Sequence, residues 1–244
     1  MLFFKKQLLF IIILTSISNI CLSHEFWIDP IKYHITNNEI VEANIFIGED
    51  FEGSPIPFTK NYFKISFLYS DQNKLKIKGR LGDIPALKIK KMFSGLNIIQ
   101  IESVTKYVEY KELVKFEIFA RKKGYPDLVK KHKEKNYPDN FYESYKRYAK
   151  SLVSVDNFDG NDVDTNMEFE LIFLDNPLKN LNKSKRILLE YKNKLLANHK
   201  VSVMSFKNGY FKKEYVKTNK EGYFDFIFKN DTKYLIESVV IIKG

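Results

Sequence analysis

Cysteine is almost absent from this chain. The only cysteine among the 244 residues is Cys21, and it lies at the end of an apolar leader. If the leader is removed after Ser23, the remaining chain contains no cysteine. No disulfide then stabilises the fold, and thiol nucleophiles and thiolate metal ligands are excluded.

Catalytic motifs are lacking as well. The sequence contains no Gly-rich phosphate-binding loop, no His-Glu-x-x-His helix and no Gly-x-Ser-x-Gly elbow. A Ser-His-Asp triad is not excluded by spacing, because its members assemble in space. Nothing in the sequence favours such a triad, and we expect a protein that is not an enzyme.

Long apolar runs are confined to the N-terminus. Lys5 and Lys6 precede an apolar stretch at residues 8–14, and small polar residues follow it up to Ser23. This order predicts a signal peptide over residues 1–23 and a periplasmic protein without a membrane span after cleavage. Two alternatives stay open: an uncleaved anchor, for which the apolar run is short, and a lipoprotein with a lipidated Cys21, for which Ile20 is a poor neighbour.

Acidic residues are fewer than basic ones. The formal net charge is +10, and it falls to +8 when Lys5 and Lys6 leave with the signal peptide. The surplus is spread along the chain, and clusters such as "KIKK" and "KKHKEK" are typical of solvated faces. We therefore expect no nucleic-acid partner.

The remaining chain predicts a mainly β fold. Short runs rich in β-branched and aromatic residues alternate at period two, which is typical of antiparallel strands. These runs are "EIVEANIFIGE", "YFKISFLYS", "KLKIKGR", "GLNIIQIESV" and "MEFELIFLDNP". Residues 48–58 contain two Gly and two Pro, and this composition predicts a loop.

Residues 111–151 predict a helical insertion. Two sets of apolar residues recur there at helical spacing: Leu113, Phe116 and Phe119, then Phe141, Tyr145, Tyr148 and Leu152. Residues 156–165 follow as a polar, acidic link. Their alternating acids around Gly160 are also similar to a calcium loop, but the Glu expected at its twelfth position is out of register, so a solvated linker is favoured.

These patterns predict two domains after the signal peptide. Residues 24–177 are expected to form an N-terminal β-sandwich that carries the helical insertion at about 111–151. Residues 178–244 are expected to form a small Ig-like or transthyretin-like sandwich. Turns are predicted at Asn193–Lys194 and at Asn219–Gly222, where the glycine accepts a positive φ.

The four histidines provide the candidate metal ligands. His132 lies in "KKHKEK" and His199 in a predicted turn, so we expect both at the surface. His24 and His34 flank the first predicted strand. Cleavage after Ser23 would free the α-amine of His24, which can chelate a metal ion together with the ring Nδ1.

Nitrogen ligands of this kind suit Ni, Co, Cu or Zn, and His34 is the second candidate ligand. The alternative is that His24 is only the first residue of the folded domain. In that case its importance lies in its neighbours Phe26 and Trp27, which are expected to enter the core.

Four segments, in this order, resemble one protein family: "HEFWIDP", "GEDFEGSPIPF", "FYESYKRYAKSLVSV" and "LIFLDNP". The chain resembles domain-of-unknown-function family 4198, whose members are often described as NikM-like nickel-uptake components. The small residue before the His-x-Phe-Trp opening is Ser23, and the Asn-Pro after an apolar strand is Asn176-Pro177. The segments "KNKLLANHKVSV" and "TNKEGYFDF" resemble turns of carboxypeptidase-regulatory or transthyretin-like modules.

The resemblance implies a β-rich periplasmic protein that binds a transition metal or assists its uptake. A metal transporter or an outer-membrane receptor would be its partner. This chain departs from the family in its last strand, where "ESVVIIKG" carries no histidine, so the ligand set is incomplete or uses His34. The alternative function is a structural or partner-docking β-sandwich module without a metal.

Overall fold

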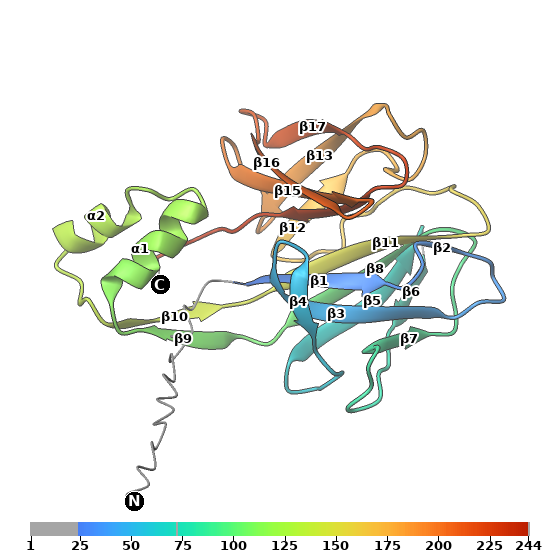
Figure 1. Cartoon of the computed structure of the whole chain (residues 1–244), viewed down its shortest axis with the longest axis horizontal. Coiled ribbons are helices and arrows are strands. Elements are labelled where there is room, and N and C mark those ends of the chain that lie inside the picture. The colour runs from blue at the N-terminus through green and yellow to red at the C-terminus, as the bar shows by residue number, and fades with distance from the viewer. Residues whose placement is uncertain (1–23, 72, 244) are drawn as a thin grey trace, which may run out of the picture.

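The computed structural model describes residues 24–71 and 73–243, so the predicted signal peptide at residues 1–23 lies outside the described residues. Within these described residues, strands form most of the regular structure, and two short helices form the rest (Figure 1). The prediction of a mainly β fold is confirmed. No helix within the described ranges is long and apolar enough to cross a membrane.

Two sheets form what we call the N-terminal unit. In the first, β3 pairs with β1, β4 and β7; these strands are β1 (Glu25–Pro30), β3 (Val41–Glu49), β4 (Glu52–Pro55) and β7 (Leu87–Ile89). The second has the order β2-β11-β8-β5-β6; its strands are β2 (His34–Ile35), β11 (Tyr148–Val155), β8 (Gly95–Ser103), β5 (Phe63–Ser70) and β6 (Asn73–Lys76). The pairings are antiparallel except that β2 runs parallel to β11.

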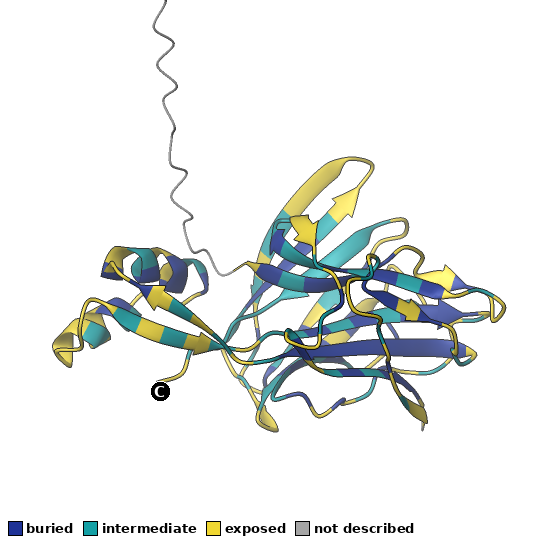
Figure 2. Ribbon diagram, turned by 90° about the horizontal axis from the view of Figure 1, so that it is seen from below, coloured by how far each residue is buried: buried dark blue, intermediate teal, exposed yellow. Residues whose placement is uncertain are grey.

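The two sheets of the N-terminal unit share one apolar core. Ile28 and Ile45 from the first sheet meet Leu68, Ile99 and Val153 from the second, and these side chains are buried. Strand β8 lies in the middle of its sheet and is buried along its whole length. Figure 2 shows the buried stretches in dark blue inside this unit. The period-two pattern of the sequence thus becomes one apolar face on each sheet.

Residues 48–58, predicted to be a loop, contain the short strand β4. The chain turns between β3 and β4 at Asp50 and Phe51, which both have positive φ, as a tight two-residue hairpin requires. Gly48 and Gly53 are Cα partners in this hairpin, and a Cβ on Gly48 would lie 2.4 Å from the Cα of Gly53. Glycine at both positions therefore allows the close approach of the two strands.

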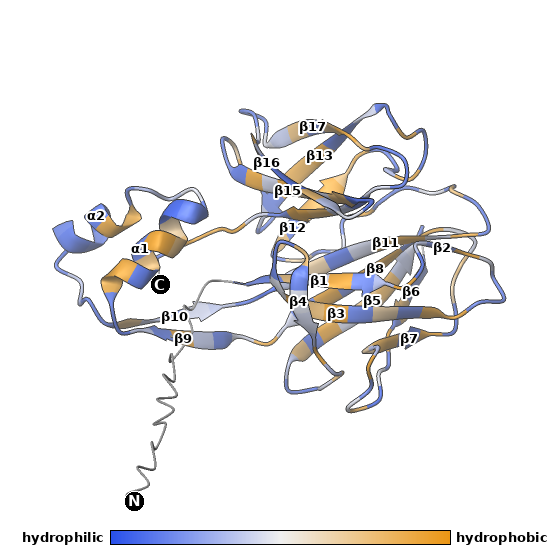
Figure 3. Ribbon diagram, viewed as in Figure 1, coloured by the Kyte–Doolittle hydropathy of each residue, from blue (hydrophilic) through white to orange (hydrophobic). Residues whose placement is uncertain are grey.

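The helical insertion is present but shorter than predicted. Helices α1 (Leu113–Lys122) and α2 (Leu128–Glu134) are carried by an antiparallel ribbon of β9 (Lys106–Tyr110) and β10 (Phe141–Tyr145). We call residues 106–145 the hairpin unit, which projects from the rest of the molecule (Figure 1). Its own small core is formed by Tyr110, Leu113, Phe116, Phe119 and Val129. Figure 3 shows apolar residues along α1 in orange.

The prediction of a helix over residues 141–152 is wrong. Phe141 and Tyr145 lie in β10, and Tyr148 and Leu152 lie in β11. A spacing of four residues is even, so it places side chains on one face of a strand as well as on one face of a helix. The pairing of β10 with β9, and of β11 with the central strand β8, decides between the two and overrides local helix propensity.

Two further sheets form what we call the C-terminal unit. The first contains β12 (Phe169–Phe173), β13 (Ser184–Tyr191), β14 (Lys194–Leu195) and β17 (Tyr223–Ile227). The second has the order β16-β15-β18; its strands are β16 (Tyr210–Lys217), β15 (Lys200–Lys207) and β18 (Lys233–Glu237). The predicted domain boundary at residue 177 places β12 in the N-terminal domain, whereas β12 pairs with β13 of the C-terminal unit.

Both predicted turns of the C-terminal unit are found. Gly222 has a φ of +78°, and Asn219 Oδ1 accepts hydrogen bonds from the N–H groups of Glu221 and Tyr223. The other turn lies at Lys192 and Asn193, one residue before its predicted place, and both residues have positive φ.

The last residues of the chain connect the C-terminal unit to the hairpin unit. Val239 and Ile241 pack against the core of the hairpin unit. The Tyr125 hydroxyl donates to Val239 O at 3.3 Å and accepts from Ile241 N at 3.1 Å. Residues far apart in sequence therefore fix the position of the two helices.

Candidate functional site

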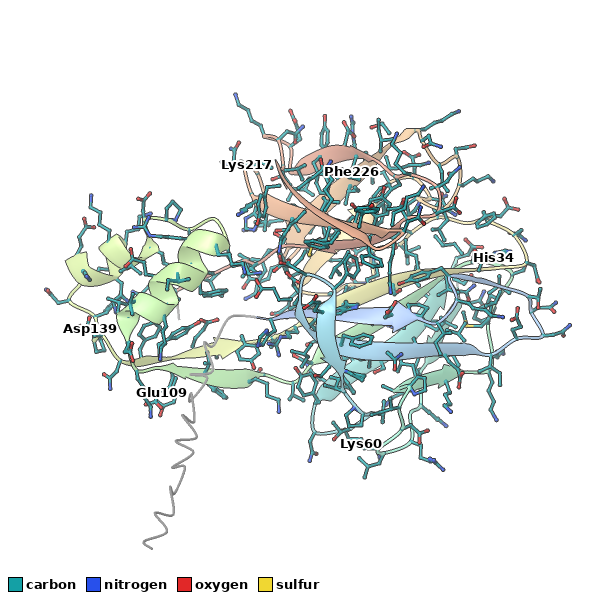
Figure 4. All side chains as sticks on the ribbon, viewed as in Figure 1. His34, Lys60, Glu109, Asp139, Lys217 and Phe226 are labelled. Atoms are coloured by element: carbon teal, nitrogen blue, oxygen red, sulfur yellow. The ribbon has the colours of Figure 1, made fainter. Side chains whose placement is uncertain are left out.

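The structure places His24 and His34 at opposite ends of the N-terminal unit. His24 is exposed and directly precedes β1, within the field of Lys122 from the hairpin unit. Figure 4 shows His34 at the end away from the hairpin-unit residues Glu109 and Asp139. In extended form, β1 alone spans about 20 Å. The structure therefore does not bring the two rings to one metal ion.

The His34 ring is held against the edge of the second sheet. Its Nδ1 lies 2.8 Å from the Ser154 hydroxyl oxygen, and the ring stacks on Phe158 with centroids 4.8 Å apart. These contacts tie β2 to β11 and to the segment that follows it. Within the described residues, the contacts of His34 therefore serve to pack β2 against its neighbours.

The other two histidines have carbonyl partners. Nε2 of His132 donates to Pro138 O at 2.8 Å, and Nε2 of His199 donates to Val239 O at 3.0 Å. Both side chains are half-buried, although a surface position was expected for both. The carbonyl of Val239 and the rings of Tyr125 and Phe169 lie against His199. Burial lowers the pKa of His199, although its hydrogen bond to Val239 opposes the shift.

Within residues 24–71 and 73–243, no group of three or more His, Cys, Asp or Glu side chains is arranged to hold a metal ion. Burial lowers the pKa of His24, and the charges of Arg147 and Lys122 lower it further. The neutral ring that a metal requires is thus favoured. The same two positive charges repel a cation. The surroundings of His24 thus favour the neutral ring and at the same time oppose the approach of a metal ion.

A cleft of about 590 Å³ separates the N-terminal unit from the C-terminal unit. Strands β1 and β11 form one wall, and β12, β18 and residues 228–232 form the other. Figure 1 shows the C-terminal sheets lying over β1 and β11. Apolar side chains line much of it, among them Trp27, Ile28, Phe169, Leu171, Tyr234 and Ile236. Apolar walls with a few polar groups are typical of ligand sites.

The start of β1 is anchored beside this cleft. Glu25 is buried, and its carboxylate accepts from Asp50 N at 2.7 Å and from Lys213 Nζ at 3.2 Å. Burial raises the pKa of Glu25 although the Lys213 charge lowers it. Because Lys213 belongs to β16, this ion pair joins the two units. Trp27 is only 5% exposed and stacks on Phe46, so its predicted burial is confirmed.

A second ion cluster lies deeper, at the floor of the cleft. Lys150 Nζ, on β11, lies 2.5 Å from Glu170 Oε1 and 3.0 Å from Asp162 Oδ1. It also donates to the carbonyl oxygens of Val163 and Leu171. The cluster therefore ties β11 to the acidic link and to β12. The link at residues 156–165 was expected to be solvated, but Asp162 within it is buried, because Lys150 binds it.

Backbone donors complete this cluster. Glu170 accepts from the N–H groups of Thr165 and Met167, and Asp162 accepts from those of Val163 and Phe173. Burial raises the pKa of both carboxyl groups, and the Lys150 charge opposes the shift in both. With this many donors on each carboxylate, the buried charges of the cluster are compensated, and we call this cluster the clamp.

Neither the cleft nor the clamp was found from the sequence. One signal was available: "YAKSLVSV" is an apolar strand interrupted by a single lysine, and an acidic segment follows soon after. A lysine in a buried strand requires a carboxylate partner, which would have pointed to Asp162. The cleft itself has no such signal, because its walls come from strands far apart in sequence.

Comparison with known families gives one match. The chain matches the family described as "Domain of unknown function (DUF4198)" over residues 21–241, and it belongs to this family. This confirms the resemblance to family 4198 that the sequence segments indicated. None of the curated proteins with which the chain was compared matches it.

Proposed function

We propose that this member of family 4198 is an exported, non-catalytic binding protein of the periplasm, and that the cleft between its two β units is the ligand site. The observation that carries the proposal is the chemistry of the cleft. Its walls are largely apolar, and the buried charges at its edge and floor are already paired, Glu25 with Lys213 and Glu170 with Lys150. A ligand for this site is therefore uncharged and mainly apolar.

The only tryptophan of the chain provides a reporter, because Trp27 lines the cleft. We would titrate the chain from His24 onward with N-phenylnaphthylamine, a neutral apolar dye that accepts energy from tryptophan. We expect saturable energy transfer from Trp27. The Leu235→Arg variant, which puts a charge into the cleft wall, should weaken dye binding by at least about tenfold.

Leu81→Arg is the matched control, since Leu81 is 76% exposed and does not line the cleft. Its dye affinity should equal that of the parent chain. Dye binding that is unsaturable, or that the two arginine variants change equally, would show that the cleft is not a ligand site. Circular dichroism of each variant checks that the fold is retained.

A second candidate function is the binding of a transition metal, as the NikM-like description of the family suggests. The observation that favours it is a difference in burial next to the predicted cleavage site: Glu25 and Trp27 are buried and fixed, whereas His24 is exposed. Cleavage after Ser23 would then leave an amine and an imidazole on an immobile support. Such a pair fits Ni, Co, Cu or Zn. A metal transporter or outer-membrane receptor would receive the ion.

Two measurements test the metal proposal. Mass spectrometry of the exported protein should show a chain that begins at His24. Calorimetric titration with Ni²⁺ and Cu²⁺ should show binding that is lost in His24→Ala and in a chain with one additional glycine before His24. If both altered chains bind as the parent does, His24 is not a ligand.

The fold itself supports a further assignment for the C-terminal unit, an Ig-like or transthyretin-like sandwich. Its two sheets share one core, to which Ile187 and Leu189 contribute from one sheet and Val201 and Val203 from the other. Sandwiches of this kind often serve as binding modules. Such a module is consistent with the binding role proposed above.

A further inference from the structure

We propose that the ligand of the cleft is an extended peptide segment of a partner protein, which adds as a strand to the free edge of β18. This inference rests on the proposed function, because it names the ligand class of the same cleft. A peptide ligand differs from the small apolar ligand of the proposed function in one respect. A small apolar molecule needs only the side chains of the cleft, whereas a peptide strand needs the unpaired backbone of β18 as well.

The alternation of hydrogen bonds in the second C-terminal sheet identifies the free backbone groups. Thr218 N donates to His199 O at 3.0 Å, so odd-numbered residues of β15 bond toward β16 and even-numbered ones toward β18. In the β15–β18 pairing, Ser202 faces Glu237 and Met204 faces Leu235. The N–H and C=O groups of these β18 residues therefore point at β15.

The N–H and C=O groups of Tyr234 and Ile236 consequently point away from β15. Strand β18 is the last strand in the order β16-β15-β18, and no strand within the described residues pairs with its outer edge. The cleft is lined by every residue from Asp231 to Ser238. Successive side chains of a strand point to opposite faces, so a cavity that touches all of them faces the edge of the strand.

Apolar side chains lie on both sides of that edge. Toward the C-terminal core, Phe169, Leu171 and Ile236 are only partly buried, although they pack against fully buried residues. Across the cleft lies Trp27 of β1, whose neighbour Ile28 contributes its side chain to the core of the N-terminal unit. An extended peptide presents alternate side chains in two opposite directions. Its side chains would therefore contact both walls at once.

The charges of the cleft favour an uncharged strand. Lys233 is paired with Asp29 at 2.5 Å, Glu237 with Lys123, and Lys150 with Glu170 and Asp162. A charged side chain deep in the cleft would find no free partner among these groups. The peptide is thus expected to carry its charges only at its ends, outside the apolar part of the cleft.

The probe is an acetylated and amidated peptide in which Thr and Val alternate between terminal lysines. We expect it to change Trp27 fluorescence in a saturable way and to compete with N-phenylnaphthylamine. The amide hydrogens of Tyr234 and Ile236 should exchange rapidly in the free protein and at least about tenfold more slowly with the peptide bound. Exchange is read by NMR on the chain from His24 onward.

Two changes test the role of the backbone. A peptide N-methylated at alternate residues keeps its side chains but loses the donors of one edge, so its affinity should fall by at least about tenfold. On the protein side, Ile236→Pro removes the outward N–H and leaves the β15 ladder intact, because that N–H does not bond to β15. Ile236→Val is its matched control and should bind the peptide as the parent does.

The outcomes separate this inference from the proposed function. If the dye binds and the Thr-Val peptide does not, strand addition is overturned and the cleft remains a ligand site. If N-methylated and unmodified peptides bind equally, strand addition is overturned as well. If neither dye nor peptide binds, the proposed function fails first. The N-methylated peptide needs no variant protein, so the test stands even if Ile236→Pro does not fold.

Discussion

The cores of the two β units differ in how completely they are closed. In the N-terminal unit, most of the apolar residues that form the core are fully buried, and strands from two sheets cover it. In the C-terminal unit, residues of β12 and β18 that belong to the core are only partly buried. The same kind of sequence pattern therefore produced one closed core and one core that is open along an edge.

The difference follows from what lies next to each edge strand. In the N-terminal unit, β1 and β11 line the cleft, but the side chains on their inner faces meet across one core that both sheets close. In the C-terminal unit, β12 and β18 end their sheets on the side of the cleft. An open apolar edge is a liability unless something covers it, and covering it is a common basis of recognition.

The largest effect is expected at the clamp that connects the two units. Lys150→Met would leave Asp162 and Glu170 buried without their cation, which should lower the free energy of unfolding by about 3–5 kcal/mol. Lys179→Met removes the exposed partner of Asp159 and should cost roughly 0–1 kcal/mol. Urea unfolding at neutral pH measures both. Equal losses would mean that the clamp does not stabilise the junction.

The next largest effect is expected from two substitutions that compare the two cores directly. Ile45→Ala in the closed core should cost about 2–5 kcal/mol, because the side chain is fully buried and its neighbours cannot collapse onto the cavity. Ile236→Ala at the open edge should cost roughly half as much, since solvent already reaches that side chain. The two variants are compared by thermal and urea unfolding. A larger cost at Ile236 would contradict the open edge.

Two glycines allow a packed turn of the C-terminal unit to be compared with an open one. Gly222 and Gly209 both have positive φ, so alanine at either position is strained by about 1–2 kcal/mol. A Cβ at Gly222 would also lie 2.5 Å from the Leu195 Cβ, whereas one at Gly209 would have no atom within 4 Å. Gly222→Ala should therefore lower the melting temperature clearly more than Gly209→Ala. Equal shifts would show that the packed turn has room to relax.

The smallest effect concerns pH and the last residues of the chain. The pKa of His199 is lowered in the folded protein, so the unfolded chain binds the proton more readily. Its contribution to stability is complete above the unfolded value of about 6.5 and is lost as the pH falls from there toward the lowered folded value. Unfolding free energies at several pH values should show this decline, and His199→Gln should show less of it. Identical profiles would mean that the contact with Val239 does not sense pH.

The sequence by itself determined the local structure of this protein. Period-two patterns located β3, β5, β8 and β12, the first apolar set of the insertion located α1, and Asn219 with Gly222 located a turn. These features depend on side chains and backbone preferences within a few residues, which a single sequence contains. The burial of Trp27 followed in the same way, because a lone tryptophan in an apolar segment needs a core.

Only the tertiary structure decided which segments meet. The spacing of four residues from Phe141 to Tyr145, and again from Tyr148 to Leu152, fits a helix and a strand equally well, and pairing with β9 and with β8 selected the two strands. Lys150 pairs with carboxylates in the link and in β12, and Glu25 pairs with Lys213 of β16. The cleft exists because β1 and β11 of one unit face β12 and β18 of the other. Such contacts depend on how whole sheets pack, and no local pattern in the sequence encodes that arrangement.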